Sequence, residues 1–128
     1  MARNVTFAEL PDVIIPVPLH RRRLRYRGFN QALLLSHELT THFSVPLSFD
    51  NLMRVRYTVP QVELSAADRR MNVEGAFRLS RPEHITGKAV LLVDDVFTTG
   101  ATINECAAVC MQADAARVTA LTLARAPE

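Results

Sequence analysis

The chain has 128 residues, of which 48% are hydrophobic and 22% charged, and its net charge is only +2. This length and composition are those of one ordinary globular domain over residues 1–128, and they exclude a disordered or fibrous protein. No apolar run approaches the roughly 20 residues that a bilayer span needs, and the first residues lack the pattern of a secretory signal. We therefore expect a cytoplasmic protein with no membrane partner.

The first elements in chain order are a buried strand, a basic loop and a helix. Residues 13–17 are β-branched and apolar, which favours a parallel strand ending near the prolines at 16 and 18. A loop over 19–28 follows, and five of its arginines fall between His20 and Arg27. From the potential N-cap Asn30 to residue 43, apolar side chains recur at helical spacing. They predict a core-facing helix in which Ala32, Leu35, Leu39 and Phe43 form a stripe that Leu33 and Leu34 widen.

The second half of the chain predicts a strand-rich segment and then a strand–helix–strand unit. Residues 47–55 and 76–79 favour strands, and 56–72 between them shows no periodicity, which is typical of a lid or binding loop. Residues 89–94 form the clearest strand, and 116–124 form the last strand. Between them, a helix follows Gly100 to about Gln112, and its apolar surface is expected from Ala101, Ile103, Ala107, Cys110 and Met111. The pattern β-α-β-β-β-α-β predicts an α/β fold with a mainly parallel sheet. Cys106 and Cys110, four residues apart, are interpreted as small buried residues of one helix face rather than a zinc or disulfide site.

The segment VLLVDDVFTTGAT, residues 90–102, carries the chemistry. Asp94 and Asp95 follow the strand at the end where open α/β sheets bind ligands. The turn into the helix offers amides and hydroxyls that can cradle a phosphate, from Thr98, Thr99, Gly100, Ala101 and Thr102. Carboxylates do not bind phosphate, so the two acids are expected to accept hydrogen bonds from sugar hydroxyls or to help hold a hydrated Mg²⁺. The combination predicts a site for a phosphorylated sugar.

Two alternatives compete with this interpretation. Taken singly, paired acids after a strand are often turn residues, and Thr or Gly before a helix is often a cap. A triphosphatase would need a GxxxxGK[ST] loop, and the four glycines of the chain form no such pattern.

Residues 90–102 resemble, over the whole segment, the phosphoribosyl pyrophosphate (PRPP) binding motif of type I phosphoribosyltransferases. The stretch PVPLHRRRLRYRGFNQA at 16–32, Pro60-Gln61, RRMN at 69–72 and GAF at 75–77 are similar to the ComF (competence protein F) branch. The resemblance covers about residues 11–124. It implies a three-layer type I phosphoribosyltransferase-like fold that is shortened at the N-terminus, because the zinc ribbon common in ComF-like proteins is not visible.

The resemblance also implies a role for each part of the site. Asp94 and Asp95 would contact the ribose 2′- and 3′-hydroxyls, and 98–102 would hold the 5′-phosphate. The loop at 56–72 would cover the reaction centre, with Arg70 neutralising charge on the leaving group. The loop after the first strand would bind pyrophosphate through Leu19, His20, Arg21, Arg22 and Arg23. The implied reaction displaces pyrophosphate from ribose C1 to an acceptor that the sequence does not identify. The resemblance implies Mg²⁺ as the cofactor. The ion would be held by PRPP, and Asp94 and Asp95 are the protein carboxylates that would be available to bind it.

The rival hypothesis is a non-catalytic competence protein that binds single-stranded DNA during DNA uptake. Arginines interleaved with aromatic residues are expected on such a surface, here Arg21, Arg22, Arg23, Arg25, Tyr26, Arg27 and Phe29. Its partners would be DNA or the competence machinery, whereas those of the transferase are PRPP and pyrophosphate. An exposed sheet edge near the N-terminus would favour a homodimer in either case.

Overall fold

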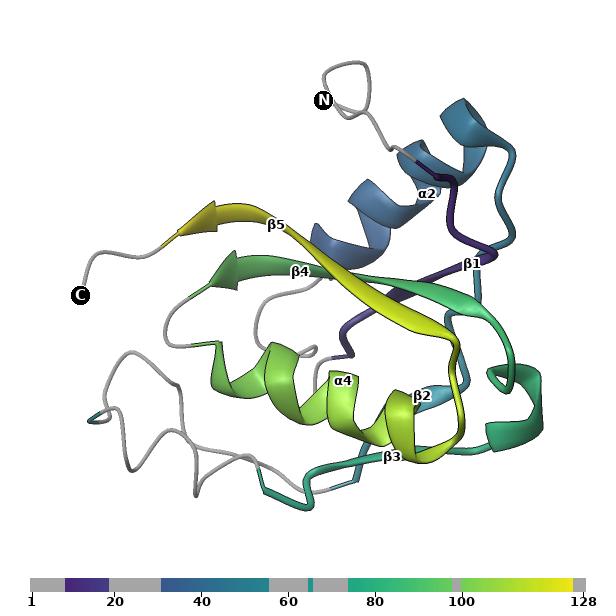
Figure 1. Cartoon of the computed structure of the whole chain (residues 1–128). Helices are drawn as coiled ribbons and strands as arrows, with labels where there is room; N and C mark the ends of the chain where they lie inside the picture. Colours follow the sequence, from purple (N-terminus) through teal and green to yellow (C-terminus); the bar gives the residue numbers. More distant parts are fainter. Residues whose placement is uncertain (1–8, 19–30, 56–64, 66–73, 98–99, 126–128) are drawn as a thin grey trace.

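The computed structural model describes residues 9–18, 31–55, 65, 74–97 and 100–125, and for 31, 95–97 and 123–125 it describes the backbone. A parallel sheet lies between two helices, and a short antiparallel ribbon lies on the side of the second helix (Figure 1). The elements are β1 Val13–Pro16, α2 Gln31–Phe43, β2 Leu52–Arg54, β3 Phe77–Leu79, the 3₁₀ helix η3 Pro82–His84, β4 Ala89–Phe97, α4 Ala101–Gln112 and β5 Arg117–Arg125. Their order confirms the predicted succession of strands and helices.

Strand β4 is the centre of a three-stranded sheet with the order β1-β4-β5. Both neighbours are parallel to it: Val13 lies opposite Val90, and Ala89 lies opposite Arg117. The carboxyl ends of the three strands therefore meet at one edge of the sheet. Strands β2 and β3 form the separate antiparallel ribbon.

The apolar sequence of β4 explains its central place. Because side chains alternate between the faces of a strand, Leu91 and Val93 join the core under α2, while Val90 and Leu92 join the core under α4. All four are almost fully buried. A strand that is apolar on both faces is covered by a layer on each side, which produces the α/β/α arrangement.

The helices present the predicted apolar stripes to the sheet, with two exceptions. In α2, Ala32, Leu35 and Leu39 are buried, whereas Leu34 is 57% exposed. The expectation that Leu34 widens the stripe is wrong, because the 100° step between residues turns it away from the sheet. In α4, Met111 is likewise exposed by 50%. The prediction that Cys106 and Cys110 share a buried face is confirmed.

Several strand boundaries differ from the predicted ones. β4 continues to Phe97, past the predicted end at Asp94, because β5 runs beside it that far. Of the predicted strand at 47–55, β2 takes Leu52–Arg54, and Leu47 makes an isolated parallel bridge to Ile14. The segment 46–48 thus covers part of the edge beside β1, through Ile14 N–H donating to Pro46 O and Ser48 N–H donating to Ile14 O, both at 2.9 Å.

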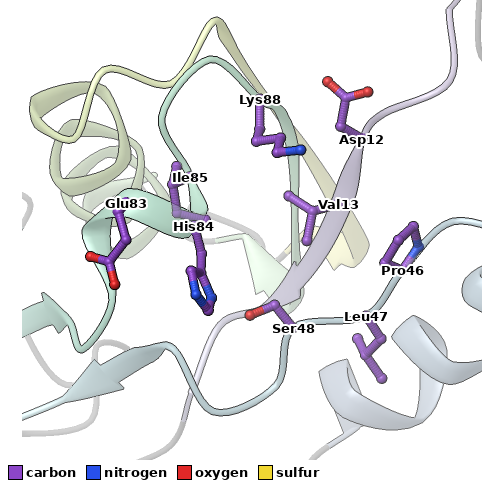
Figure 2. A pocket seen from close by; sticks show the side chains of 9 residues that line it. All are labelled: Asp12, Val13, Pro46, Leu47, Ser48, Glu83, His84, Ile85 and Lys88. Carbon is purple, nitrogen blue, oxygen red and sulfur yellow. The ribbon is translucent and has the colours of Figure 1, made fainter.

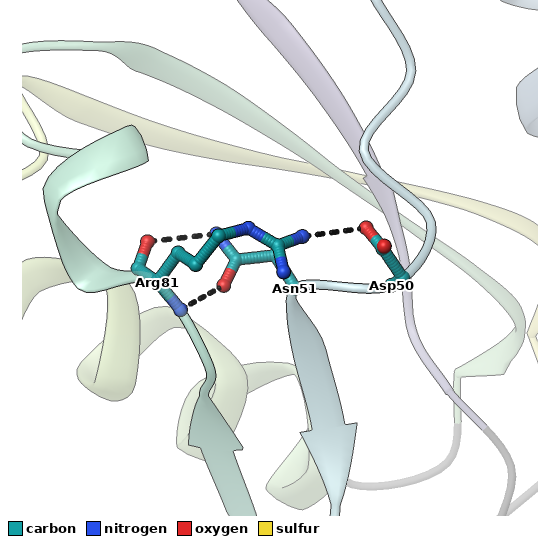
Figure 3. A network of polar contacts seen from close by, with 3 residues as sticks. All are labelled: Asp50, Asn51 and Arg81. Carbon is teal, nitrogen blue, oxygen red and sulfur yellow. Dashed lines mark hydrogen bonds and ion pairs between the residues drawn. The ribbon is translucent and has the colours of Figure 1, made fainter.

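A buried amide fastens the ribbon to the chain that follows it (Figure 3). Asn51 is fully buried, and its side chain bonds both backbone groups of Arg81: Arg81 N–H donates to Oδ1 at 2.6 Å, and Nδ2 donates to Arg81 O at 3.0 Å. The Arg81 guanidinium adds an exposed ion pair with Asp50 at 2.7 Å. These contacts fix where η3 begins relative to β2.

In the part of the chain that the structure describes, neither α2 nor α4 is long and apolar enough to cross a membrane.

Candidate functional site

Asp94 is the sixth residue of β4 and lies just past the point where the pairing with β1 ends. Asp94 is half-buried and lies opposite Thr122 of β5, while on the other side Val17 N–H donates to Val93 O at 2.8 Å. Because side chains alternate along a strand, Asp94 lies on the same face as Val90 and Leu92, which is the face that α4 covers. Asp95 continues the backbone of β4, and its side chain lies outside the described set.

The turn after β4 leads directly into α4. Gly100 is buried and adopts φ +84°, ψ +3°, the left-handed conformation that residues other than glycine adopt only at a cost. Its carbonyl accepts the hydrogen bond that opens the helix, from Asn104 N–H at 2.7 Å, and no described side chain caps this end. Ala101 is buried and Thr102 half-buried, so the first turn of α4 starts beside the end of β4.

The dipole of helix α4 favours negatively charged groups near the N-terminus of the helix. The first amides of a helix point along the positive end of its dipole, where phosphate and carboxylate groups bind. A carboxylate at the end of β4 and a helix N-terminus close to it together suit a ligand that carries both hydroxyl groups and a phosphate.

A third element, the ribbon, contributes a charge that the sequence analysis missed. The guanidinium of Arg54 lies 4.7 Å from the centre of the Phe77 ring, which directs it across the ribbon. Arg54 and Asp94 both act on the thiol of Cys106 in α4: burial raises the pKa of Cys106 most, Arg54 lowers it, and Asp94 raises it. A cation from β2 therefore lies near the candidate site. The sequence feature that could have indicated this cation is the alternation of side chains along β2, which puts Arg54 on the same inward face as Leu52.

Helix α4 also holds the segment that precedes β3. Gly75 N–H donates to Glu105 Oε1 at 3.2 Å. This hydrogen bond joins the described residues just before β3 to the helix whose first turn forms the candidate phosphate site.

Most of the other predicted site residues lie outside the described residues. They are Leu19, His20, Arg21, Arg22, Arg23, Arg25, Tyr26, Arg27, Phe29, Arg70, Thr98 and Thr99. Their predicted roles stay predictions. Asp94, Gly100, Ala101 and Thr102 are the predicted residues that the structure describes with their side chains, and it brings them to one edge of the sheet.

The described side chains at this edge of the sheet supply only part of the oxygen ligands that a cation such as Mg²⁺ binds. A half-exposed carboxylate such as Asp94 is the ligand type that Mg²⁺ prefers. Among the described residues, no three His, Cys, Asp or Glu side chains come together as a metal site. A Mg²⁺ ion here would therefore complete its coordination with water and with oxygens of a bound ligand.

Comparison with protein families matches residues 28–128 to the phosphoribosyl transferase domain. Among curated proteins, the chain is 44% identical over 105 residues to "Competence protein F" of Haemophilus influenzae, covering 81% of this chain and 46% of that protein. It is 40% identical over 124 residues to "DNA utilization protein YhgH" of Escherichia coli K12, covering 97% and 54%, and 32% identical over 125 residues to "Competence protein ComFC" of Bacillus subtilis, covering 94% and 49%. The chain spans about half the length of these relatives.

Solved structures show the same fold at low sequence identity. The glutamine PRPP amidotransferase of Bacillus subtilis, complexed with ADP and GMP, aligns with a TM-score of 0.63 at 21% identity, covering 95% of this chain and 24% of that one. A Trypanosoma cruzi hypoxanthine phosphoribosyl transferase aligns with a TM-score of 0.52 at 15% identity, covering 99% and 66%. The fold, the family match and the curated relatives agree: the chain belongs to the type I phosphoribosyltransferase domain family, in its ComF-like branch.

Proposed function

We propose that the chain binds PRPP with Mg²⁺ and displaces pyrophosphate from ribose C1 to an acceptor nucleophile. The observation that supports this most directly is that Asp94, in the later half of β4, precedes the left-handed Gly100 at the start of α4. A hydroxyl-rich ligand with a phosphate ester complements this pair, and PRPP is such a ligand.

The residues would share the work as follows. Asp94, with Asp95, accepts hydrogen bonds from the ribose hydroxyls, and the amides of Gly100, Ala101 and Thr102 donate to the 5′-phosphate. The bond from ribose C1 to the pyrophosphate oxygen breaks as the bond to the acceptor forms, and the electron pair leaves with pyrophosphate. Arginines at 21, 22 and 70 would balance the charge that develops there. Positioning and exclusion of water then supply most of the acceleration.

Mg²⁺, when bound, would neutralise the pyrophosphate and make it a better leaving group, with Asp94 as the described protein group able to contribute an oxygen.

Calorimetric titration with PRPP in the presence of Mg²⁺ tests the proposal. We expect Asp94→Asn to weaken binding by about tenfold or more, because a charge-assisted hydrogen bond to the ribose is replaced by a neutral one. Asp94→Asn combined with Asp95→Asn should abolish binding.

Asp114→Asn is the matched control. It removes the same charge beyond the far end of α4, at an exposed position with φ +64° that Asn tolerates well. Its PRPP affinity should equal that of the wild type. Unchanged affinity in the Asp94 and Asp95 variants would reject the site, and release of pyrophosphate from PRPP across a panel of bases and amines would identify the acceptor.

The names of the relatives favour a second function, in which the chain binds single-stranded DNA during DNA uptake. The arginines at 21, 22 and 23 would carry it through phosphate contacts. Changing all three to Ala should then weaken binding of an oligonucleotide and flatten its salt dependence. A chain that binds no oligonucleotide at low salt would exclude this function.

We also propose that the protein acts in the cytoplasm as a homodimer. Cys106 and Cys110 are both unpaired thiols, which persist in reducing compartments. In the described sheet, β5 pairs with β4 on one side, and its other side is an edge open to a second chain.

A further inference from the structure

A cavity of about 450 Å³ lies at the amino end of the sheet (Figure 2). The start of β1 forms one wall, the segment 46–48 a second, and the chain from η3 to the start of β4 the third. Its volume falls within the range of small-molecule sites, about 300–1,000 Å³.

This cavity is separate from the candidate PRPP site. Lys88 precedes β4, and Asp94 lies six residues further along the chain. At about 3.3 Å of rise per residue, these six residues of extended chain span roughly 20 Å. They lie at opposite ends of the same parallel strands.

Hydrogen bonds to each wall hold the cavity open. Asp12 Oδ2 accepts from Ala89 N–H at 2.8 Å, and Lys88 N–H donates to Ile85 O at 3.0 Å. The segment that carries Ser48 is bonded to Ile14, and the start of η3 is fixed by the buried Asn51 amide. Because each wall is anchored by the fold itself, the cavity does not depend on a ligand to form.

Three polar side chains, those of Ser48, His84 and Lys88, line this cavity. Within the described part of the chain, the side chains of Ser48, His84 and Lys88 make no hydrogen bond or ion pair. Figure 2 shows the His84 ring and the Ser48 hydroxyl facing one another at one end, with the Lys88 ammonium toward the other. The apolar side chains of Val13 and Ile85 lie between these ends.

Two acidic side chains, Asp12 and Glu83, also line the cavity. Asp12 already accepts a backbone hydrogen bond, and the carboxylate of Glu83 points away from the cavity in Figure 2. The cavity thus has an ammonium group at one end, apolar side chains in the middle, and a hydroxyl and an imidazole at the other end. This arrangement suits a ligand that has a negative group, an apolar body and a polar group in the same order.

We infer that this cavity binds a small organic anion. Its carboxylate or phosphate pairs with Lys88, its apolar body packs on Val13 and Ile85, and a polar group at its far end bonds with Ser48 and His84. This site is independent of the proposed PRPP site, so either can fail without the other.

Lys88 is the only lysine in the chain, which makes a selective test possible. Reductive methylation with ¹³C-formaldehyde labels Lys88 and the N-terminal amine while keeping their charges. The labelled protein is titrated with benzoate, phenyl phosphate and the neutral benzamide, and the ¹³C-methyl signal of Lys88 is followed by NMR together with the backbone amides of Val13 and Ile85.

We expect benzoate or phenyl phosphate to bind with millimolar affinity, as ligands of about nine to eleven heavy atoms do, and to shift all three signals. Whichever anion binds more tightly identifies the head group. Followed through the amides, Lys88→Gln should weaken binding by about tenfold, the loss of one charge-assisted hydrogen bond. Ser48→Ala should leave the affinity unchanged, because neither probe carries a polar group at its far end.

Arg78→Gln is the matched control, because it removes the same charge at an exposed position on β3 outside the cavity. Its affinity for the anion should equal that of the wild type. Equal binding of benzamide, equal affinity of the Lys88→Gln protein, or no shift at these three residues up to about 10 mM anion would each overturn the inference.

Discussion

Gly100 and Asp94 would carry the proposed PRPP site at the scale of single residues, and for different reasons. Asp94 would act through its charge, at a half-buried position past the end of the pairing with β1. Gly100 matters for its backbone, because φ +84° aims the first turn of α4 at the place where β4 ends. A side chain at this position would strain the turn and move the amides that are proposed to hold the phosphate.

Gly100→Ala should therefore have two effects. The left-handed conformation costs a residue with a Cβ about 1–2 kcal/mol, so the free energy of unfolding in urea should fall by about that amount. PRPP affinity should fall as well, by about tenfold, because the donors shift.

Gly87→Ala separates these two effects. Gly87 has φ +75° and no atom within 4 Å of an added Cβ, so it carries the same strain at the amino end of the sheet. It should lose similar stability and keep its PRPP affinity. Equal loss of affinity in both variants would mean that Gly100 acts through stability alone.

The buried side-chain amide of Asn51 is expected to contribute strongly to the stability of the fold. Asn51→Ala leaves the N–H and the C=O of Arg81 without their partners, and each such buried group costs about 1–3 kcal/mol. We expect a loss of about 2–4 kcal/mol, measured by urea denaturation. Asp50→Asn breaks the exposed ion pair of the same network and should cost less than about 1 kcal/mol. Equal losses in the two variants would show that the amide is not the fastening contact.

At the scale of elements, some features follow from a local sequence pattern and could be predicted, whereas others depend on tertiary contacts and could not. The strand at β4 and the helix at α4 were predictable because a continuous apolar run and helical spacing appear in the sequence itself. The end of β4 was not, since pairing with β5 extends it to Phe97. The ribbon depends on its partner in the same way: Leu52–Arg54 becomes a strand because Phe77–Leu79 lies against it.

The same division holds for the candidate site. The motif at 90–102 predicted Asp94 and Gly100, because a strand, a turn and a helix in succession fix their own geometry. Arg54 could not be predicted, since its distance to α4 depends on how the ribbon packs, although a cation on the inward face of a strand was a signal. The cavity at Lys88 joins three segments far apart in the sequence, and no local pattern marks it.

Helix α4 carries two thiols that should make stability depend on pH. Burial raises the pKa of Cys110 to about 11 from its ordinary 9.0, and that of Cys106 is also raised. The unfolded chain loses these protons at lower pH than the folded chain does. The stabilisation is therefore fully present below about pH 9 and is lost as pH rises toward 11.

Cys110→Ala should flatten this decline. Urea denaturation of wild type and variant between about pH 8 and 11 isolates the Cys110 contribution, because other groups titrate equally in both proteins. Parallel declines in the two proteins would contradict a buried, protonated thiol at this position.

At the scale of the whole molecule, the α/β/α layers place two distinct features at opposite ends of the same strands. The carboxyl end carries Asp94 and the start of α4, and the amino end carries the cavity with Lys88. The open side of β5 runs between these ends, so a second chain could pair there without covering either of them.

The proposed homodimer predicts a mass of twice 14.3 kDa in sedimentation equilibrium. A monomer at all concentrations up to about 1 mM would exclude the dimer.

The most direct test of the account follows the backbone amides of ¹⁵N-labelled protein during titration with ribose 5-phosphate. The account predicts the largest shifts at Asp94 and at Gly100, Ala101 and Thr102, with Val13 and Lys88 unchanged, and it predicts that Asp94→Asn weakens the response. Saturation with ribose 5-phosphate that leaves the amides at 94 and 100–102 unmoved would contradict it.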